Sequence, residues 1–426
     1  MLSTTEAVAR GSSQLTSHLQ KAVILIVDGL GDLPVAGLAG RTPLEAARTP
    51  VLDRLAAAGC YGLVDPIVPG EIPNTDSGVG LLFGLPPEQS GTLHRGPVEA
   101  SGAGRRLQQG EIAVRANFAT LEQRPDGLWV TDRRAGRITE HVDELARAID
   151  GIELGDGLRA DFRPTDQHRG VLILSGTGLD AAVSDTDPGD TGSPGLVPEA
   201  KPLQPSARLT AAKINLFLHE AHRRLVDHPV NRARVAAGQP PASGVITRGA
   251  GAGIRPTSRL EAQGLRAAVI AGCNTVLGLA SLFDFDTVRD PAFTAALDTD
   301  LDGKVAAALA ALQDHDIAYV HIKASDLCAH DRKPAAKRDF LERLDSALAP
   351  LASAGVIVAL SSDHTTDSNT GAHTADPVPS LIFDPAGRRP EGESRPNFGE
   401  AACRQGNLPR LRSFEFLDRV LSKIGC

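Results

Sequence analysis

The stretch KAVILIVDGLGD, residues 21–32, decides the fold class that this sequence predicts. Residues 22–27 form a continuous aliphatic run of strand length, which is typical of a strand buried on both faces. Comparable runs occur later in the chain, at residues 267–272, 317–322, 355–360 and 380–384. Helical patterns separate the later runs, at 301–313 and 335–352, and strands that alternate with helices form a parallel sheet with crossover helices. We therefore predict an α/β fold whose core is a mostly parallel sheet flanked by helices.

Size and composition favour a globular enzyme. The chain has 426 residues, of which 42% are hydrophobic and 23% charged, and its aromatic share of 4% indicates a mostly aliphatic core. The formal net charge of -8 argues against binding to a nucleic acid polymer, which needs a basic surface. An anionic ligand must therefore be held by a local cluster of basic side chains.

The cysteines and the first residues indicate where the protein works. The five cysteines are scattered and have no C-x-x-C spacing, which predicts neither a disulfide framework nor a zinc ribbon and favours the reducing cytoplasm. Residues 1–20 lack the features of a signal peptide and are expected to form a flexible N-terminal extension. No run approaches the roughly 20 apolar residues of a membrane span, so no membrane partner is expected.

The middle of the chain differs in pattern from the two ends. Residues 91–245 contain shorter, more alternating strands and a Pro/Gly-rich stretch, so we predict an inserted smaller α/β domain that binds the substrate. The core then comprises residues 21–90 and 246–426. An amphipathic helix is expected over about 207–227, and GAGAG, residues 249–253, is expected to be a turn.

Polar side chains gather where the predicted strands end. In open parallel sheets ligand sites form outside the carboxyl ends of the strands. Six acids and imidazoles follow those ends, namely Asp28, Asp326, His330, Asp363, His364 and His373. Taken singly, each also fits a turn or a surface position, but together they form a ligand set that chance rarely assembles. A mixed Asp/His set suits Mn²⁺ or Zn²⁺, with Mg²⁺ also compatible, and six ligands are enough for two divalent ions if a hydroxyl bridges them.

A second candidate feature is PNTDSGVG, residues 73–80, which is typical of a turn when it is taken alone. It offers two hydroxyl groups, those of Thr75 and Ser77, as candidates for a nucleophile. A hydroxyl bound to a metal ion loses its proton more easily, so either residue is chemically competent beside the predicted ions.

Several ordered segments resemble the archaeal-type, cofactor-independent (2,3-bisphosphoglycerate-independent) phosphoglycerate mutases of the alkaline phosphatase superfamily. They lie between about residues 20 and 420 and read VDGLGD, TPLEAARTPVLDRLAAAG, RGPVEASGAG, RANFATL, TDRRAGRI, RGAGAG, ASDLCAHDRKP, and SDHTTD followed by AHTADPVP. The resemblance implies an alkaline-phosphatase-like core with an inserted domain, and conversion of 3-phosphoglycerate to 2-phosphoglycerate.

The resemblance also implies the roles of the metal ligands. One ion is held by Asp326, His330 and His373, and the other by Asp28, Asp363, His364 and the nucleophile. The mutases present a serine at the position of Thr75 and usually a histidine at that of Val79, so a phosphothreonine intermediate is implied here. Related phosphodiesterases and phosphonoacetate hydrolases use threonine. The alternative is therefore a hydrolase or transferase for a phosphonate, a nucleotide phosphonate or a phosphodiester in a specialised biosynthetic pathway, and the full ligand set disfavours an inert homologue.

A phosphorylated acid needs several arginines, because arginine matches carboxylate and phosphate oxygens with two parallel hydrogen bonds. The predicted substrate-binding residues are Arg95, Arg115, Arg133, Arg137, His168, Arg169, Arg248 and Lys323. Any single arginine also fits a solvated surface group, and His168 fits a plain loop histidine. The expected partner is a small phosphorylated or phosphonate acid, and self-association into a homo-oligomer is compatible with the sequence.

Overall fold

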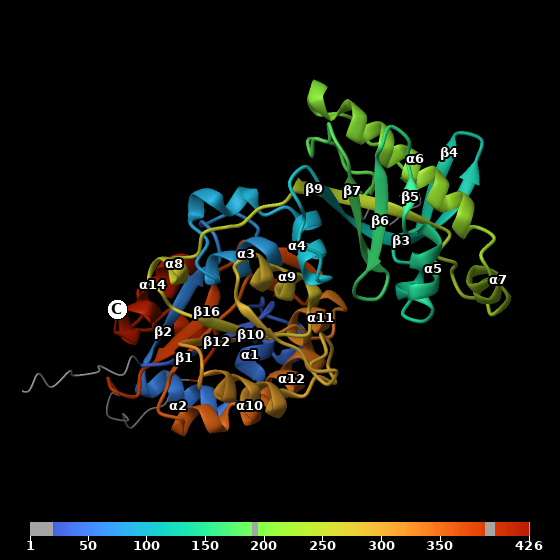
Figure 1. Cartoon of the computed structure of the whole chain (residues 1–426). Helices are drawn as coiled ribbons and strands as arrows, with labels where there is room; N and C mark the ends of the chain where they lie inside the picture. Colours follow the sequence, from blue (N-terminus) through green and yellow to red (C-terminus); the bar gives the residue numbers. More distant parts are fainter. Residues whose placement is uncertain (1–19, 190–194, 388–396, 426) are drawn as a thin grey trace, which may run out of the picture.

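The structure of the chain is a computed structural model that describes residues 20–189, 195–387 and 397–425. Its larger part is an eight-stranded sheet in the order β11-β10-β12-β1-β13-β16-β2-β17 (Figure 1). These strands are β1 (Ala22–Val27), β2 (Cys60–Asp65), β10 (Ala267–Ile270), β11 (Asp286–Val288), β12 (Ile317–Ile322), β13 (Ile357–Ser361), β16 (Val378–Phe383) and β17 (Leu411–Arg412). The aliphatic run of residues 22–27 is β1, which pairs with β12 on one side and β13 on the other.

Helices cover both faces of this sheet (Figure 1). Successive residues of a strand point to opposite faces, so Ile24 and Ile26 contribute to one apolar cluster while Val23, Leu25 and Val27 contribute to the other. The first cluster includes residues of α3 (Thr75–Leu82), α8 (Arg259–Ala262), α9 (Asn274–Leu282) and α14 (Ser413–Ile424). The second includes residues of α1 (Pro43–Ala46), α2 (Pro50–Ala58), α10 (Leu301–Ala311) and α12 (Pro334–Ala347).

Most neighbouring strands of the large sheet run parallel. β1 is parallel to β12 and β13, and β10 is parallel to β11 and β12. β16 runs antiparallel to β13 and β2, because the chain returns from β13 through the short hairpin of β14 (Thr365–Asp367) and β15 (Ala372–Thr374) rather than through a crossover helix. The predicted α/β fold with a mostly parallel, helix-flanked sheet is confirmed.

The smaller part is a second sheet in the order β5-β6-β7-β3-β4-β8, with β9 paired to β3. Its strands are β3 (Ile112–Arg124), β4 (Gly127–Asp132), β5 (Ile152–Glu153), β6 (Arg159–Pro164), β7 (Arg169–Ser175), β8 (Gly195–Leu196) and β9 (Gly244–Ala252). The helices α5 (Val142–Ile149) and α6 (Arg208–Leu225) share a third apolar cluster with this sheet. Helix α6 coincides with the expected amphipathic helix, and α7 (Pro229–Ala236) follows it.

The turn expected at residues 249–253 is wrong, because strand β9 continues through most of this stretch. Gly249 has φ +64°, and a Cβ at this position would lie 3.0 Å from the Cβ of Arg95. The glycines therefore mark a close approach of helix α4 (Arg95–Gly102) to the strand, and the chain does not reverse direction there.

Helix α4 lies between the two sheets (Figure 1), where it contacts α9 on one side and β3 and β9 on the other. The contact with α9 is tight, since a Cβ at Gly278 would lie 2.0 Å from the carbonyl oxygen of Val98. Because α4 belongs to both interfaces, the boundaries of the predicted core (21–90 and 246–426) and inserted domain (91–245) stay a prediction.

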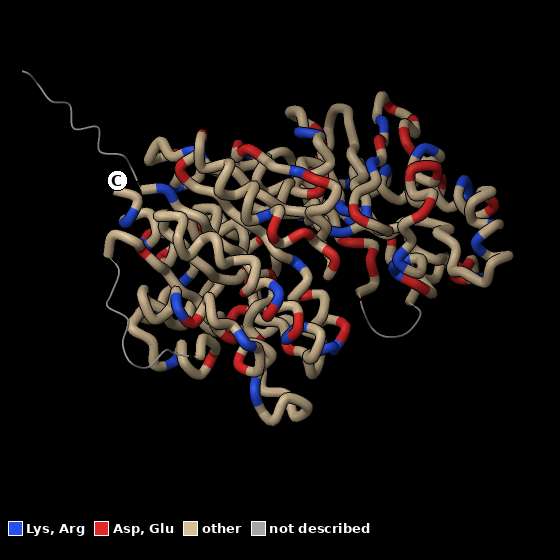
Figure 2. The backbone as a smooth tube through the Cα atoms, turned by 90° about the horizontal axis from the view of Figure 1, so that it is seen from below, with Lys and Arg blue, Asp and Glu red and all other residues tan. Residues whose placement is uncertain are grey.

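The remaining expectations concern membranes, cysteines and charge. None of the described helices is long and apolar enough to cross a membrane. Among the described cysteines, Cys273, Cys328 and Cys403 are free, and Sγ of Cys60 lies 3.6 Å from the carbonyl oxygen of Ile382. Cys426 and residues 1–19 of the expected N-terminal extension lie outside the described residues. Acidic and basic positions are interspersed along both parts of the chain (Figure 2).

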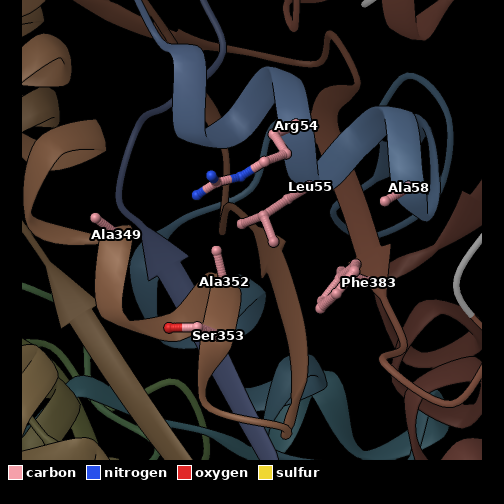
Figure 3. Close-up of a pocket in the computed structure, with 7 residues that line it drawn as sticks. All are labelled: Arg54, Leu55, Ala58, Ala349, Ala352, Ser353 and Phe383. Carbon is pink, nitrogen blue, oxygen red and sulfur yellow. The ribbon is translucent and has the colours of Figure 1, made fainter. Parts of the chain in front are cut away.

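A small hollow of about 300 Å³ lies between α2, β16 and the 3-10 helix η5 (Ala349–Ser353) (Figure 3). It is lined by Arg54, Leu55, Ala58, Ala349, Ala352, Ser353 and Phe383. This lining offers neither an acid nor an imidazole, so the chemistry predicted from the sequence belongs to a larger cavity between the two sheets.

Candidate active site

The six predicted metal ligands come together at the carboxyl end of the large sheet. They are Asp28 directly after β1, Asp326 and His330 on α11 (Ala324–His330) after β12, Asp363 and His364 between β13 and β14, and His373 on β15. Because β1, β12 and β13 are parallel neighbours, their carboxyl ends lie at one edge. The β14–β15 hairpin then brings His373 back to the same edge, as the distances below show.

Asp326, His330 and His373 form the first ligand group. Nε2 of His330 lies 3.3 Å from Oδ1 of Asp326 and 3.3 Å from Nε2 of His373, which is 3.7 Å from the same Oδ1. Tetrahedral ligands about 2.1 Å from a cation lie about 3.4 Å from one another. These three atoms therefore have the separations of ligands to one ion.

Asp28, Asp363 and His364 form the second group, and all three are fully buried. Nε2 of His364 lies 3.3 Å from Oδ1 of Asp28 and 3.2 Å from Oδ2 of Asp363. The imidazole of His364 stacks on that of His373 with 3.6 Å between ring centroids, so the two groups adjoin.

The hydrogen bonds of His330 and His373 fix which nitrogen of each imidazole is free to bind a cation. Nδ1 of His330 lies 2.8 Å from the carbonyl oxygen of Gly371, and Nδ1 of His373 lies 3.1 Å from that of Pro73. Because a carbonyl oxygen only accepts, both Nδ1 atoms carry the proton and donate it. Each Nε2 then offers a lone pair to the ligand group, which is the usual arrangement around a protein-bound metal.

Both groups fit a divalent cation. Oδ1 of Asp28, Oδ2 of Asp363 and Nε2 of His364 are buried without a hydrogen-bond partner. Buried polar atoms are normally paired, and unpaired charges deep in a protein are costly unless they coordinate a metal. A donor set of carboxylate and imidazole suits ions such as Mn²⁺ and Zn²⁺.

Lys323 lies between the two groups. Its Nζ is 2.8 Å from Oδ2 of Asp28 and 2.7 Å from Oδ2 of Asp326. Burial alone would lower the pKa of this lysine, but the two carboxylates raise it well above its ordinary value. The side chain is therefore a fixed positive charge beside both ligand groups.

Thr75 is the first residue of helix α3, so the interpretation of residues 73–80 as a turn is wrong. Asn74 caps the helix by accepting from the backbone N–H of Ser77. The start of α3 lies against the ligands, because a Cβ at Gly78 would be 2.3 Å from the carbonyl oxygen of Asp363. The hydroxyl-bearing Thr75 lines the same cavity as the first ligand group.

The other two positions of interest on α3 have structural partners. The hydroxyl of Ser77 donates to the carbonyl oxygen of Asn74 at 3.1 Å and accepts from its N–H at 3.2 Å, which completes a capping box. Val79 is fully buried in the first apolar cluster. Of the two candidate nucleophiles, Thr75 lines the cavity, whereas the hydroxyl of Ser77 is engaged in the capping box at the start of the helix.

The cavity lies between the two sheets and has a volume of about 620 Å³. All eight predicted substrate residues line it: Arg95, Arg115, Arg133, Arg137, His168, Arg169, Arg248 and Lys323. Its wall also contains Arg134, from the segment TDRRAGRI, and four residues that the sequence did not single out, namely Asn117, Gln167, Thr275 and Arg332. Eight arginines and one lysine face only three carboxylates, those of Asp76, Asp326 and Asp331, so an acidic protein has a strongly basic cavity.

Acidic partners hold several of these arginines. Asp187 accepts from Arg133 through both carboxylate oxygens, at 2.8 and 2.6 Å. Glu99 lies 3.4 Å from Nε of Arg115 and also accepts from the side chains of Asn274 and Thr275 on α9. The remaining ion pairs are Arg95 with Asp76 at 3.3 Å and Arg137 with Asp331 at 3.4 Å. These acids were missed because an acid in a helix or loop has no sequence signal that distinguishes it from a surface residue.

Arg248 and His168 lack such compensation. No carboxylate of the described residues lies within 4.0 Å of Arg248, and burial together with the nearby Arg115 lowers its pKa to about 9. Burial and the nearby Arg169 lower the pKa of His168 to about 3, so its imidazole is neutral at pH 7. An anion in the cavity would offset the repulsion between Arg248 and Arg115.

Comparison with known proteins places this geometry in a family. The family model for 2,3-bisphosphoglycerate-independent phosphoglycerate mutase matches residues 56–231. A protein of that name from Methanopyrus kandleri is 39% identical over 416 residues, which cover 95% of this chain and 96% of the relative. The chain belongs to the archaeal-type family of 2,3-bisphosphoglycerate-independent phosphoglycerate mutases. Another mutase of the family, from Methanosphaerula palustris, is 41% identical and covers 96% of this chain and 98% of its own length.

Two solved structures have a similar fold. The cofactor-independent phosphoglycerate mutase from Thermoplasma acidophilum matches with a TM-score of 0.66 and 31% identity. The match covers 95% of this chain and 100% of the mutase. A protein from Pyrococcus horikoshii matches with a TM-score of 0.78 and 30% identity, over 95% of this chain and 97% of that protein.

Proposed function

We propose that this chain interconverts 3-phosphoglycerate and 2-phosphoglycerate without 2,3-bisphosphoglycerate, and that Thr75 carries the phosphoryl group between the two positions. One observation carries the proposal. Thr75 lines a single cavity together with the first ligand group and with eight arginines. A small acid that bears both a phosphate and a carboxylate matches this distribution of positive charge.

Two divalent cations complete the proposed site. Asp326, His330 and His373 hold one, and Asp28, Asp363 and His364 hold the other together with Thr75. Mn²⁺ and Zn²⁺ suit these donors best, and Mg²⁺ is compatible with them. When bound, such ions lower the pKa of a coordinated hydroxyl and offset charge on phosphoryl oxygens.

The protein's own groups account for the transfer. The oxygen of Thr75 loses its proton and forms a bond to phosphorus, while the bond from phosphorus to the 3-oxygen of the substrate breaks and that oxygen takes up a proton. The 2-hydroxyl of the retained glycerate then loses its proton and its oxygen attacks the phosphothreonine, while the bond from phosphorus to the threonine oxygen breaks and this oxygen takes up a proton. The N-terminus of α3 favours negative charge at Thr75, and Lys323 adds a fixed positive charge nearby.

The arginines hold the substrate and keep the glycerate in place between the two transfers. Arg133 is held by both carboxylate oxygens of Asp187, so little side-chain entropy is lost when it binds an anion. Glu99 lies 3.4 Å from Nε of Arg115 and attracts this second arginine without a hydrogen bond to that atom. The cavity lies between the two sheets, and their approach toward each other would exclude water during the reaction. If water entered, the phosphothreonine would be hydrolysed and the enzyme would act as a phosphatase.

Phosphorus NMR tests the proposal directly. The protein is incubated with 3-phosphoglycerate and Mn²⁺, and the metal is removed by chelation before the spectrum is recorded. We expect the signal of 2-phosphoglycerate to appear. Free phosphate alone would indicate a phosphatase, and an unchanged spectrum with each of Mn²⁺, Zn²⁺ and Mg²⁺ would overturn the proposal.

A second candidate is cleavage of a phosphonate or a phosphodiester at the same site. Threonine at the proposed nucleophile position is the observation that favours it, because the related phosphodiesterases and phosphonoacetate hydrolases use threonine there. The same NMR experiment with a phosphonoacid and a nucleotide phosphodiester distinguishes the two candidates, because each substrate has its own chemical shift.

A further inference from the structure

Thr366 lies behind the two ligand groups and is fully buried on strand β14. Its hydroxyl donates to Oδ1 of Asp326 at 2.8 Å, and it lies 3.0 Å from Nδ1 of His364. Asp326 belongs to the first ligand group and His364 to the second. One hydroxyl therefore contacts a ligand of each proposed ion.

The direction of these hydrogen bonds follows from the donor count. A hydroxyl has one proton, and a carboxylate only accepts, so the proton of Thr366 goes to Asp326. The oxygen of Thr366 must then accept the Nδ1 proton of His364. This leaves Nε2 of His364 as the free atom, and it faces Asp28 and Asp363.

The backbone around Thr366 holds the hydroxyl in place. Thr366 pairs with His373 across the β14–β15 hairpin, so it is also tied to a third ligand. A Cβ at Gly29, the residue after Asp28, would lie 2.7 Å from the hydroxyl oxygen of Thr366. The carbonyl oxygen of Thr366 accepts from the buried Lys337 at 3.4 Å. A shift of either ligand group would therefore displace Thr366 as well.

We propose that Thr366 is a positioning residue that couples the two cation sites, so that filling one site orients a ligand of the other and strengthens its binding. The inference rests on the proposed two-cation site. The coupling passes through the hydroxyl of Thr366 alone. Its hydrogen bond to Asp326 fixes the direction of the O–H bond, and this leaves the hydroxyl oxygen free to accept from Nδ1 of His364.

Substitution of the hydroxyl tests the coupling. Thr366→Val removes it at nearly constant volume, and Thr366→Ser retains it. The neighbouring Thr365, whose hydroxyl donates to the carbonyl oxygen of Asp376 at 3.1 Å and to no ligand, supplies the matched control Thr365→Val. Mn²⁺ is titrated into each metal-free protein by calorimetry, and the thermal unfolding of each is recorded with and without Mn²⁺.

The wild type, Thr366→Ser and Thr365→Val are expected to bind two ions, the second more tightly than independent sites would allow. Thr366→Val is expected to bind roughly 10- to 100-fold more weakly and without this enhancement, as for other residues that orient metal ligands. Its gain in melting temperature on adding Mn²⁺ should be correspondingly smaller. Thr366→Ala is the second variant if the valine form does not fold.

Two results would contradict different parts of the inference. A wild type that binds fewer than two ions would overturn the two-cation site itself, and with it the coupling. A wild type with two coupled ions and a Thr366→Val or Thr366→Ala form with the same isotherm would overturn only the role of Thr366.

Discussion

At the scale of single residues, the activity depends on which hydroxyl faces the cavity. Thr75→Ala should lower the rate of 2-phosphoglycerate formation by roughly 1,000-fold or more, since the acceptor of the phosphoryl group is lost. Thr75→Ser should keep activity within about tenfold, because the hydroxyl remains. The rates are measured from phosphorus spectra of the quenched reactions.

Ser77→Ala is the matched control, because among the described residues Ser77 hydrogen-bonds within the capping box of α3 alone. It should cost about 1 kcal/mol of stability and leave the chemistry intact. Full activity of Thr75→Ala together with loss of activity in Ser77→Ala would move the nucleophile to Ser77.

Arg248 gives a prediction with opposite effects on binding and stability. Arg248→Met should lower kcat/KM by roughly 10- to 100-fold, the effect of losing hydrogen bonds to a charged ligand. It should also raise the melting temperature of the ligand-free protein, because a buried guanidinium without a carboxylate partner is removed. Steady-state kinetics and thermal unfolding check both effects.

Arg223→Met is the control for Arg248, since Arg223 is paired with Glu220 on the exposed side of α6. It should change neither quantity appreciably. A lower melting temperature for Arg248→Met would show that this arginine stabilises the fold and would remove it from the substrate site.

The residues differ in how well the sequence reveals them. The proposed cation ligands follow strand ends, so their positions carry a spatial prediction, and the structure brings them together. Glu99 and Asp187, which hold Arg115 and Arg133, follow no such rule. Each of these acids meets its arginine only because the fold brings together segments that are distant in sequence. No local pattern in a single sequence indicates that contact.

At the scale of elements, hydrophobic runs predicted strands β1, β10, β12, β13 and β16 of the large sheet, and helical patterns predicted α10 and α12 beside it. The start of α3 was missed because Asn, Thr, Asp and Ser favour both turns and helix N-termini. Strand β9 was missed because its glycines suggested a turn, whereas they accommodate helix α4. In both cases the residues do mark a change in the backbone pattern. Tertiary contacts decide whether that change is a turn, a helix start or a close approach between elements.

The contact between α3 and the loop after β13 supports an element-scale prediction. Gly78→Ala would place a Cβ 2.3 Å from the carbonyl oxygen of Asp363, so α3 must move away from the second ligand group. We expect a loss of about 1–3 kcal/mol of stability and weaker Mn²⁺ binding. Urea unfolding and calorimetry measure the two effects.

Gly37→Ala is the control, because a Cβ at Gly37 meets no atom within 4 Å. It should leave Mn²⁺ binding unchanged. Equal Mn²⁺ affinities of Gly78→Ala and the wild type would show that α3 does not position the ligands.

At the scale of the whole molecule, stability should depend on pH through Glu400, which is buried away from the site. Burial raises its pKa from 4.5 to about 7, although Thr42 and the N–H of Asp32 donate to it. The folded protein therefore holds a proton that the unfolded chain releases between these values. Stability should fall as the pH rises through this window, by roughly 3 kcal/mol in total from this group.

Glu400→Gln cannot titrate, so the difference between its unfolding curve and that of the wild type isolates the contribution of Glu400. Urea unfolding is followed at pH 5 and pH 7.5 in the presence of a chelator. A wild type that loses no more stability than Glu400→Gln between these two pH values would show that Glu400 is ionised in the folded protein.

The arrangement of the whole molecule concentrates positive charge where the two sheets meet, in a protein whose net charge is -8. The central claim is that two cations lie at this place beside Thr75. Anomalous diffraction from crystals grown with Mn²⁺ tests it most directly. We predict two peaks, one among Asp326, His330 and His373 and one among Asp28, Asp363 and His364. Well-diffracting crystals with no peak at either group would contradict the claim.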